Sequence, residues 1–192
     1  ELCTSIDCYV ERIRAHITDK GYQDVVLVGH SMGGAIALQY GLQYPGELKA
    51  LVLISTGARL KVHPQYLREL EEAVQDRTKW LKDREARHAF LPSDLRKSFV
   101  EKAAEIGPAA QLHDYLLCDK FDAMDRVEEI ILPTLVLCGS EDIMTPVKFS
   151  HYLANKIPGA RSQIVDGASH FVPLERPEEI NKAIAEFVLT LS

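Results

Sequence analysis

The apolar and polar residues of the chain follow two different periods. Ile6, Val10, Ile13 and Ile17 recur at helical spacing with charged residues between them, and Gly21 follows as a helix stop. Short apolar runs with turn residues on either side predict buried strands. These runs are Val25 to Val28, Leu51 to Ile54 and Leu135 to Leu137, with a less apolar fourth from Arg161 to Val165.

Helical patterns lie between and after these runs, from Ala35 to Tyr40 and from Pro177 to Leu191. Strands that alternate with helices imply a parallel sheet joined by right-handed crossovers. The sequence therefore predicts an α/β fold.

About seventy residues separate the second predicted strand from the third, far more than a crossover needs. This segment is rich in helix formers and carries two amphipathic stripes: Leu67, Leu70 and Val74, then Leu95, Phe99, Ala103 and Ile106. We expect a core formed by residues 1–57 and 130–192, with residues 58–129 inserted as a helical cap over the sheet.

The overall composition excludes some classes of protein. The chain has 192 residues, 46% of them hydrophobic and 26% charged, with a formal net charge of −6. Mixed charge with an acidic excess argues against a nucleic-acid binder, which needs a basic face. No apolar run reaches membrane-spanning length. We expect a small-molecule partner, with no nucleic acid and no membrane, and the oligomeric state stays open.

The four cysteines are Cys3, Cys8, Cys118 and Cys138, and their spacing matches no zinc pattern. Structural thiols in a reducing compartment are the expectation, and hence a cytoplasmic location. A disulfide between Cys3 and Cys8 is the alternative left open.

The seven histidines contain no pair with metal-ligand spacing, so neither a metal nor another cofactor is expected. His63, His88 and His113 fall in the inserted segment and are expected at the surface.

The clearest chemical motif is Gly29-His30-Ser31-Met32-Gly33, which fits the pattern Gly-x-Ser-x-Gly between a predicted strand and a predicted helix. A sharp strand-to-helix turn exposes a serine hydroxyl at the cost of backbone strain. Gly29 and Gly33 are expected to remove side chains that would clash there. The turn also leaves the Met32 N–H free to stabilise an oxyanion. Ser31 is the predicted nucleophile of this elbow.

A nucleophilic serine needs a base, and the base needs an acid to orient it. Asp142 follows the third predicted strand, and His170 follows the fourth in a loop that contains glycine. Both loops leave the carboxyl ends of parallel strands, where the active sites of such sheets lie. Asp142 is the predicted acid and His170 the predicted base. Glu141 remains an alternative to Asp142.

Three stretches together resemble the α/β-hydrolase superfamily, especially its capped esterases, lactonases and carbon–carbon bond hydrolases. They are Val25 to Gly34, then Leu132 to Gly139 running into Glu141, Asp142 and Pro146, then Gly167 to Phe171 followed by Pro173-Leu174-Glu175-Arg176-Pro177. The order Ser, acid, His is that of this fold. Serine at position 31 sets the chain apart from the dehalogenase and epoxide hydrolase branches, which carry aspartate there.

The chain departs from this family at its beginning. Family members start with four further strands, and the loop after the third donates the second oxyanion N–H. Neither is present, so the edge of the first strand would be unpaired. We expect the chain to be the C-terminal two-thirds of a longer enzyme. If it stands alone, loss of one oxyanion donor costs about 2.7–4 kcal/mol of transition-state stabilisation. Pairing of the bare edge with a second chain would soften that loss.

The resemblance implies a carboxylesterase-like serine hydrolase that cleaves a carboxylic ester through an acyl-enzyme. A carbon–carbon bond hydrolase or a lactonase with the same catalytic residues is the first alternative. A non-catalytic ligand-binding protein, or an inactive fragment of this fold, is the second.

Overall fold

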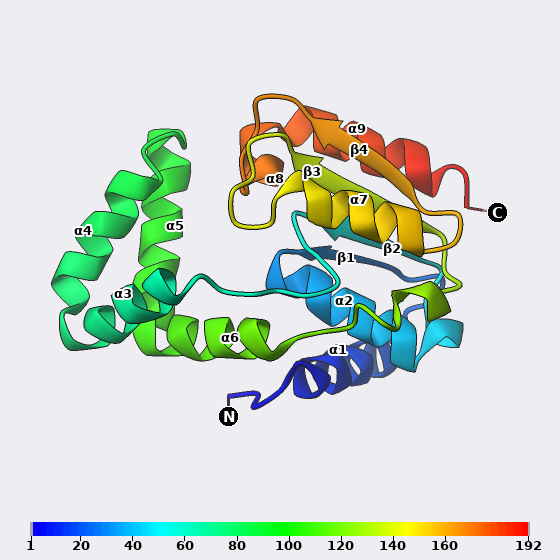
Figure 1. Cartoon of the computed structure of the whole chain (residues 1–192), viewed down its shortest axis with the longest axis horizontal. Helices are drawn as coiled ribbons and strands as arrows, with labels where there is room; N and C mark the ends of the chain where they lie inside the picture. The colour runs from blue at the N-terminus through cyan, green and yellow to red at the C-terminus, as the bar shows by residue number, and fades with distance from the viewer. Residues whose placement is uncertain (1, 192) are drawn as a thin grey trace. The chain divides into compact units, whose positions relative to one another are not determined.

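The chain forms a four-stranded parallel sheet, in a computed structural model that describes residues 2–191 (Figure 1). Its strands lie in the order β1 (Val26–His30), β2 (Ala50–Ile54), β3 (Thr134–Gly139) and β4 (Arg161–Val165). Every neighbouring pair is parallel. The α/β class expected from the sequence is confirmed.

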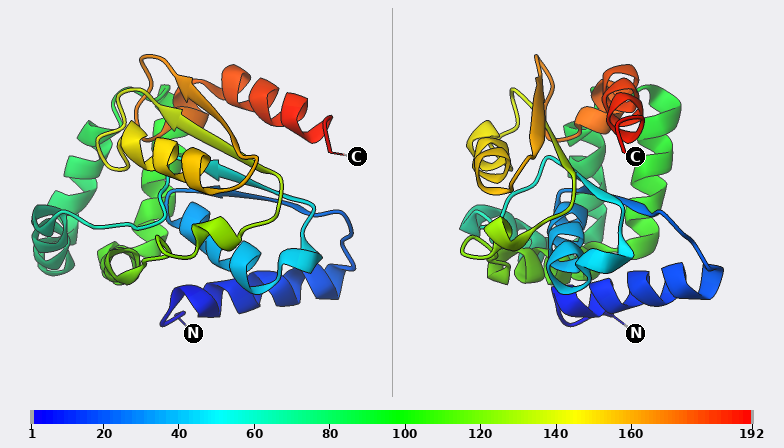
Figure 2. Two further views of the ribbon diagram at one scale, coloured as in Figure 1. Left: turned by 45° about the vertical axis from the view of Figure 1, so that its right-hand side comes forward. Right: turned by 90° about the vertical axis from the view of Figure 1, so that its right-hand side faces the viewer.

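Helices cover both faces of this sheet. α2 (Met32–Gln43) packs on β1 and β2, α7 (Val147–Lys156) packs on β3 and β4, and α9 (Pro177–Val188) contacts β3. Figure 2 shows α7 and α9 on opposite sides of the sheet. The short helix α8 (Val172–Glu175) precedes α9, and two 3₁₀ turns lie at Pro45–Glu47 and Val127–Glu129.

α1 (Ile6–Lys20) has clear signals at both ends. Ser5 Oγ accepts a hydrogen bond from Cys8 N–H at 3.1 Å, which caps the first turn. Gly21 ends the helix in the left-handed conformation at φ 64°. This helix packs against α2.

The two central strands are buried along their whole length, as expected of parallel strands with helices on both faces. Their side chains pack against α9 through Ile180, Ala183 and Phe187. Burial of this apolar surface holds the sheet in place and therefore fixes the ends of its strands.

β1 differs from the central strands because, within residues 2–191, it pairs only with β2. Val28 is 47% exposed, although strand residues of a parallel sheet are normally covered. This is the unpaired edge that the sequence led us to expect.

A second compact unit, Lys61–Lys120, consists of helices alone. It contains α3 (Pro64–Gln75), α4 (Arg77–Arg87), α5 (Ser93–Ile106) and α6 (Pro108–Lys120). Leu70, Ala73, Trp80 and Ala103 form its own small core. The other unit comprises the residues up to Leu60 and those from Phe121 onward.

The expectation of structural thiols is wrong for two of the four cysteines, and the expectation that His88 lies at the surface is wrong. Cys3 and Cys8 form a disulfide, whereas Cys118 and Cys138 are buried free thiols. His88 is buried rather than at the surface, and its Nδ1 lies 2.7 Å from the carbonyl oxygen of Arg84. Neither a disulfide between cysteines five positions apart nor the burial of one histidine at the end of a helix has a distinct sequence signal.

None of the helices in the described part of the chain is long and apolar enough to cross a membrane.

Candidate active site

The three predicted catalytic residues lie at one edge of the sheet. Ser31 follows β1, Asp142 follows β3 and His170 follows β4. Because the strands are parallel, their carboxyl ends meet at the same edge. The rings of His30 and His170 lie 4.9 Å apart between centroids, so the serine turn and the histidine loop are in contact.

Ser31 has a strained backbone, with φ 54° and ψ −118°. A non-glycine residue with positive φ is uncommon and persists only where its surroundings enforce it. Here Ser31 N–H donates to the carbonyl of Ile54 at 2.9 Å, and Thr56 Oγ1 donates to the Ser31 carbonyl at 2.8 Å. Both contacts come from β2 and the residues that follow it, and they hold the turn in place.

Met32 begins α2 immediately after this turn. The first N–H groups of a helix lack an intrahelical partner and carry the positive end of the helix dipole. The Met32 N–H is therefore available to an anion next to Ser31.

The glycines of the motif differ in whether the surrounding atoms leave room for a Cβ. A Cβ at Gly29 would collide with the backbone of Gly33, so glycine is required there. A Cβ at Gly33 would meet nothing within 4 Å, so the clash expected at that position is wrong. The second steric requirement falls on Gly34, where a Cβ would collide with the side chain of Thr56.

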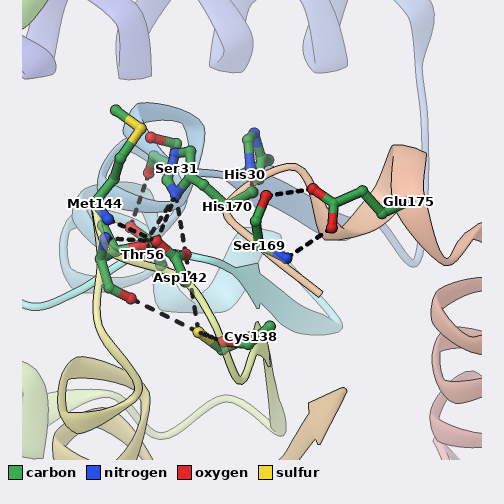
Figure 3. Close-up of polar contacts among 11 residues, drawn as sticks. His30, Ser31, Thr56, Cys138, Asp142, Met144, Ser169, His170 and Glu175 are labelled. Atoms are coloured by element: carbon green, nitrogen blue, oxygen red, sulfur yellow. Dashed lines mark hydrogen bonds and ion pairs between the residues drawn. The ribbon is translucent and has the colours of Figure 1, made fainter. Parts of the chain in front are cut away.

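Asp142 is 4% exposed and accepts several hydrogen bonds. Its Oδ1 accepts from the backbone N–H groups of Met144 and Thr145 at 2.9 and 2.8 Å. Its Oδ2 accepts from Thr145 Oγ1 at 2.8 Å and lies 2.9 Å from His170 Nδ1. Figure 3 shows Asp142 and His170 with the residues around them. The carboxylate is thus fixed in one orientation toward the imidazole.

Opposing effects act on the pKa of Asp142. Burial, the largest effect, raises this pKa, but the hydrogen bond and the electrostatic interaction with His170, together with the donors of Thr145, outweigh burial. The pKa of Asp142 is held below its ordinary value, so the carboxylate is ionised at neutral pH.

His170 is 5% exposed and turns Nδ1 toward Asp142. Since an ionised carboxylate only accepts hydrogen bonds, Nδ1 carries the proton and Nε2 is the basic nitrogen of the neutral ring. This assigns the tautomer that a general base requires.

Glu141 was the alternative acid, and the structure does not bring it to His170. Its side chain is exposed, while its backbone N–H donates to the carbonyl of Ala168 at 2.9 Å. Of these two adjacent carboxylates, it is that of Asp142 that contacts the imidazole.

Sequence reasoning missed two residues that support this pair. Thr145 Oγ1 lies 3.2 Å from His170 Nδ1 in addition to binding Asp142. Gly139 lets the histidine loop approach β3, because a Cβ there would collide with the backbone of Ala168. A threonine three residues after an acid is a weak signal of such a turn, since short polar side chains often bind nearby backbone groups.

Among residues 2–191 no group of three or more His, Cys, Asp or Glu is arranged to hold a metal ion.

Known proteins agree with this fold. A sequence model of the alpha/beta hydrolase family matches residues 3–183. The chain therefore belongs to the α/β hydrolase family, as its motifs indicate.

Individual relatives carry esterase and synthase names. A putative esterase/lipase from Mycoplasma genitalium is 29% identical over 191 residues, which cover 94% of this chain and 69% of that protein. A putative 2-succinyl-6-hydroxy-2,4-cyclohexadiene-1-carboxylate synthase from Bacillus subtilis is 31% identical, with 87% of this chain and 66% of that protein covered. The solved structure of a thermophilic esterase superimposes with a TM-score of 0.83 at 30% identity, covering 100% of this chain and 76% of that one. The chain thus spans about two-thirds to three-quarters of these relatives.

Proposed function

We propose that this protein is a serine hydrolase that cleaves a carboxylic ester through an acyl-enzyme intermediate. The observation that carries the proposal is the buried hydrogen bond between His170 Nδ1 and Asp142, in a loop that contacts the turn of Ser31. The strained backbone at Ser31 supports its role as the nucleophile.

In the proposed reaction, Ser31 Oγ attacks the ester carbonyl while His170 Nε2 takes its proton. Asp142 holds the ring in the required tautomer and stabilises the imidazolium that forms. His170 then protonates the departing alcohol, which leaves the acyl group on Ser31. A water molecule, deprotonated by His170, attacks the acyl group, and His170 returns this proton to Ser31 Oγ as the acid is released.

Negative charge develops on the former carbonyl oxygen in both steps. The Met32 N–H at the start of α2 is one proposed donor to this oxyanion. Removing one such donor typically costs about 2.7–4 kcal/mol. A second donor from residues outside this sequence stays a prediction from the family resemblance.

Carbon–carbon bond hydrolysis is the second candidate reaction. It comes from the family resemblance, and it stays open because the relative from Bacillus subtilis is named a synthase and not an esterase. The same nucleophile and base would serve, so analysis of the products distinguishes the two reactions. Cleavage of an ester releases an alcohol, whereas cleavage of a carbon–carbon bond does not.

The remaining expectations from the sequence stay predictions. These are the role of the helical unit as a cap, the small-molecule substrate and the cytoplasmic location. The Cys3–Cys8 disulfide counts against the location, because disulfides persist mainly in oxidising compartments.

The test is hydrolysis of p-nitrophenyl esters of increasing acyl length, together with a fluorophosphonate label located by peptide mass. We expect label on Ser31, and a fall in kcat on the order of 10⁶-fold for Ser31→Ala. Ser162→Ala, on the exposed part of β4, is the matched control and should keep full activity.

Turnover that survives Ser31→Ala would contradict the proposal. Tight retention of an ester without turnover or labelling would instead favour a ligand-binding protein of this fold.

A further inference from the structure

Two side chains hold the backbone on either side of His170, and neither is part of the proposed catalytic trio. Glu175 Oε2 accepts from the backbone N–H of Ser169 at 2.7 Å, and Glu175 Oε1 accepts from the Ser169 hydroxyl. On the other side, His30 Nε2 lies 2.7 Å from the carbonyl oxygen of His170. Figure 3 shows the two contacts between Ser169 and Glu175.

The direction of the His30 contact follows from its chemistry. A carbonyl oxygen only accepts, so His30 Nε2 carries a proton and donates it. Burial, with a smaller contribution from nearby His170, lowers the pKa of His30. The ring is therefore neutral at neutral pH, and its single N–H donates to the backbone carbonyl of His170.

The rest of the loop is held mainly by backbone contacts to the turn after β3. Gly167 N–H donates to Ser140 Oγ at 2.9 Å, and the carbonyl of Ala168 accepts from Glu141 N–H at 2.9 Å. These contacts hold the loop as far as Ala168, the residue before Ser169. The last two residues before Phe171 depend on Glu175 and His30, which lie 145 positions apart in the sequence.

We propose that Glu175 and His30 are positioning residues that fix the backbone of His170, so that its ring stays on Asp142 and beside the turn that carries Ser31. We call this arrangement, formed by Glu175, Ser169 and His30, the His170 clamp. The proposal rests on the proposed function, because it assigns the clamp to the general base. An error of about 1 Å in the placement of a catalytic group costs about 10²-fold in rate.

The first test replaces the carboxylate of the clamp. We expect Glu175→Ala to lower kcat about 10²-fold with KM nearly unchanged, because the base moves while the substrate contacts stay. Glu175→Gln keeps one acceptor oxygen and should recover part of the loss. Glu178→Ala, which removes an exposed carboxylate in the first turn of α9, is the matched control and should have wild-type kcat.

The second test asks whether Glu175 acts through His170. In a His170→Ala background, where there is no imidazole to position, Glu175→Ala should lower the residual rate no further. A merely structural role would lower both rates by the same factor, and that result would overturn the proposal. Wild-type kcat in Glu175→Ala would also overturn it.

The His30 side of the clamp has its own pair of variants. His30→Phe keeps a ring but loses the donor, whereas His30→Gln keeps an amide N–H that donates. We expect the phenylalanine variant to lose kcat and the glutamine variant to recover part of it. Equal kcat in the two variants would remove His30 from the clamp.

A readout independent of turnover separates this proposal from the proposed function. Amide hydrogen exchange of the peptide that spans residues 166–172 should speed up in Glu175→Ala and not in Glu178→Ala. Wild-type turnover in His170→Ala would overturn the proposed function. Unchanged exchange in Glu175→Ala would overturn the clamp.

Discussion

The serine turn and the acid–histidine pair are built in different ways. The turn from Gly29 to Gly34 is compact in sequence, and backbone sterics shape most of it, since a Cβ at Gly29 has no room. The pair joins Asp142 to His170 across 28 positions through side-chain hydrogen bonds. The serine turn depends on the absence of a side chain at Gly29, whereas the acid–histidine pair depends on hydrogen bonds between polar side-chain atoms.

This difference explains why the two regions carry different sequence signals. A steric requirement is met almost only by glycine, so it leaves a visible pattern. A hydrogen-bonded carboxylate can be supplied from several neighbouring positions, as the adjacent Glu141 and Asp142 illustrate. The comparison predicts that substitutions in the acid–histidine pair lower kcat, whereas substitution of Gly29 in the turn lowers the free energy of unfolding.

Among changes to the acid–histidine pair and to the glycines of the turn, the largest effect is expected from Asp142→Asn, which keeps the size of the side chain and removes its charge. An amide next to Nδ1 favours the wrong imidazole tautomer, and kcat should fall about 10⁴-fold. Glu141→Gln is the matched control, and steady-state ester hydrolysis should give nearly wild-type values. A larger loss in Glu141→Gln than in Asp142→Asn would reverse the assignment of the acid.

Gly29→Ala and Gly33→Ala test the steric basis of the turn. The first forces a methyl group into the backbone of Gly33, and we expect the free energy of unfolding to fall by about 3 kcal/mol. The second places its methyl group in open space within α2, where alanine is favoured over glycine by about 1 kcal/mol. Urea unfolding monitored by circular dichroism measures both. Equal destabilisation by the two changes would mean that the clash at Gly29 relaxes away.

Thr145→Val removes the hydroxyl that donates to Asp142 Oδ2 while keeping its shape. Hydrogen bonds to charged groups contribute about 1.5–3 kcal/mol, so the free energy of unfolding should fall by about 2 kcal/mol at neutral pH. Thr145→Ser keeps the hydroxyl and is the control.

The loss of unfolding free energy in Thr145→Val should depend on pH, because it acts through the ionised form of Asp142. The pKa of Asp142 is lowered in the folded state, so its contribution to stability is present above the unfolded pKa and is lost as the pH falls through the folded value. Thr145→Val raises the folded pKa toward its ordinary value. The difference from the wild type should therefore be full near neutral pH and shrink in strong acid. A difference that is constant with pH would mean that the hydroxyl does not act on the charge.

Much of the fold could be predicted because periodicity is local. The four apolar runs became β1 to β4, and the stripes near Leu70 and Phe99 lie on α3 and α5. The disulfide and the burial of His88 could not be predicted in the same way, because each depends on what the chain packs against after folding.

The sequence by itself determined the strand-to-helix turn at Ser31 and the order in which nucleophile, acid and base follow their strands. Short-range sterics and hydrophobic period encode these features within a few residues. Only the tertiary structure decided that Asp142 rather than Glu141 binds His170, that Gly34 rather than Gly33 meets Thr56, and that Glu175 and His30 hold the histidine loop. These choices depend on distances between atoms far apart in the chain, and hydrogen bonds and steric clashes change within a fraction of an ångström.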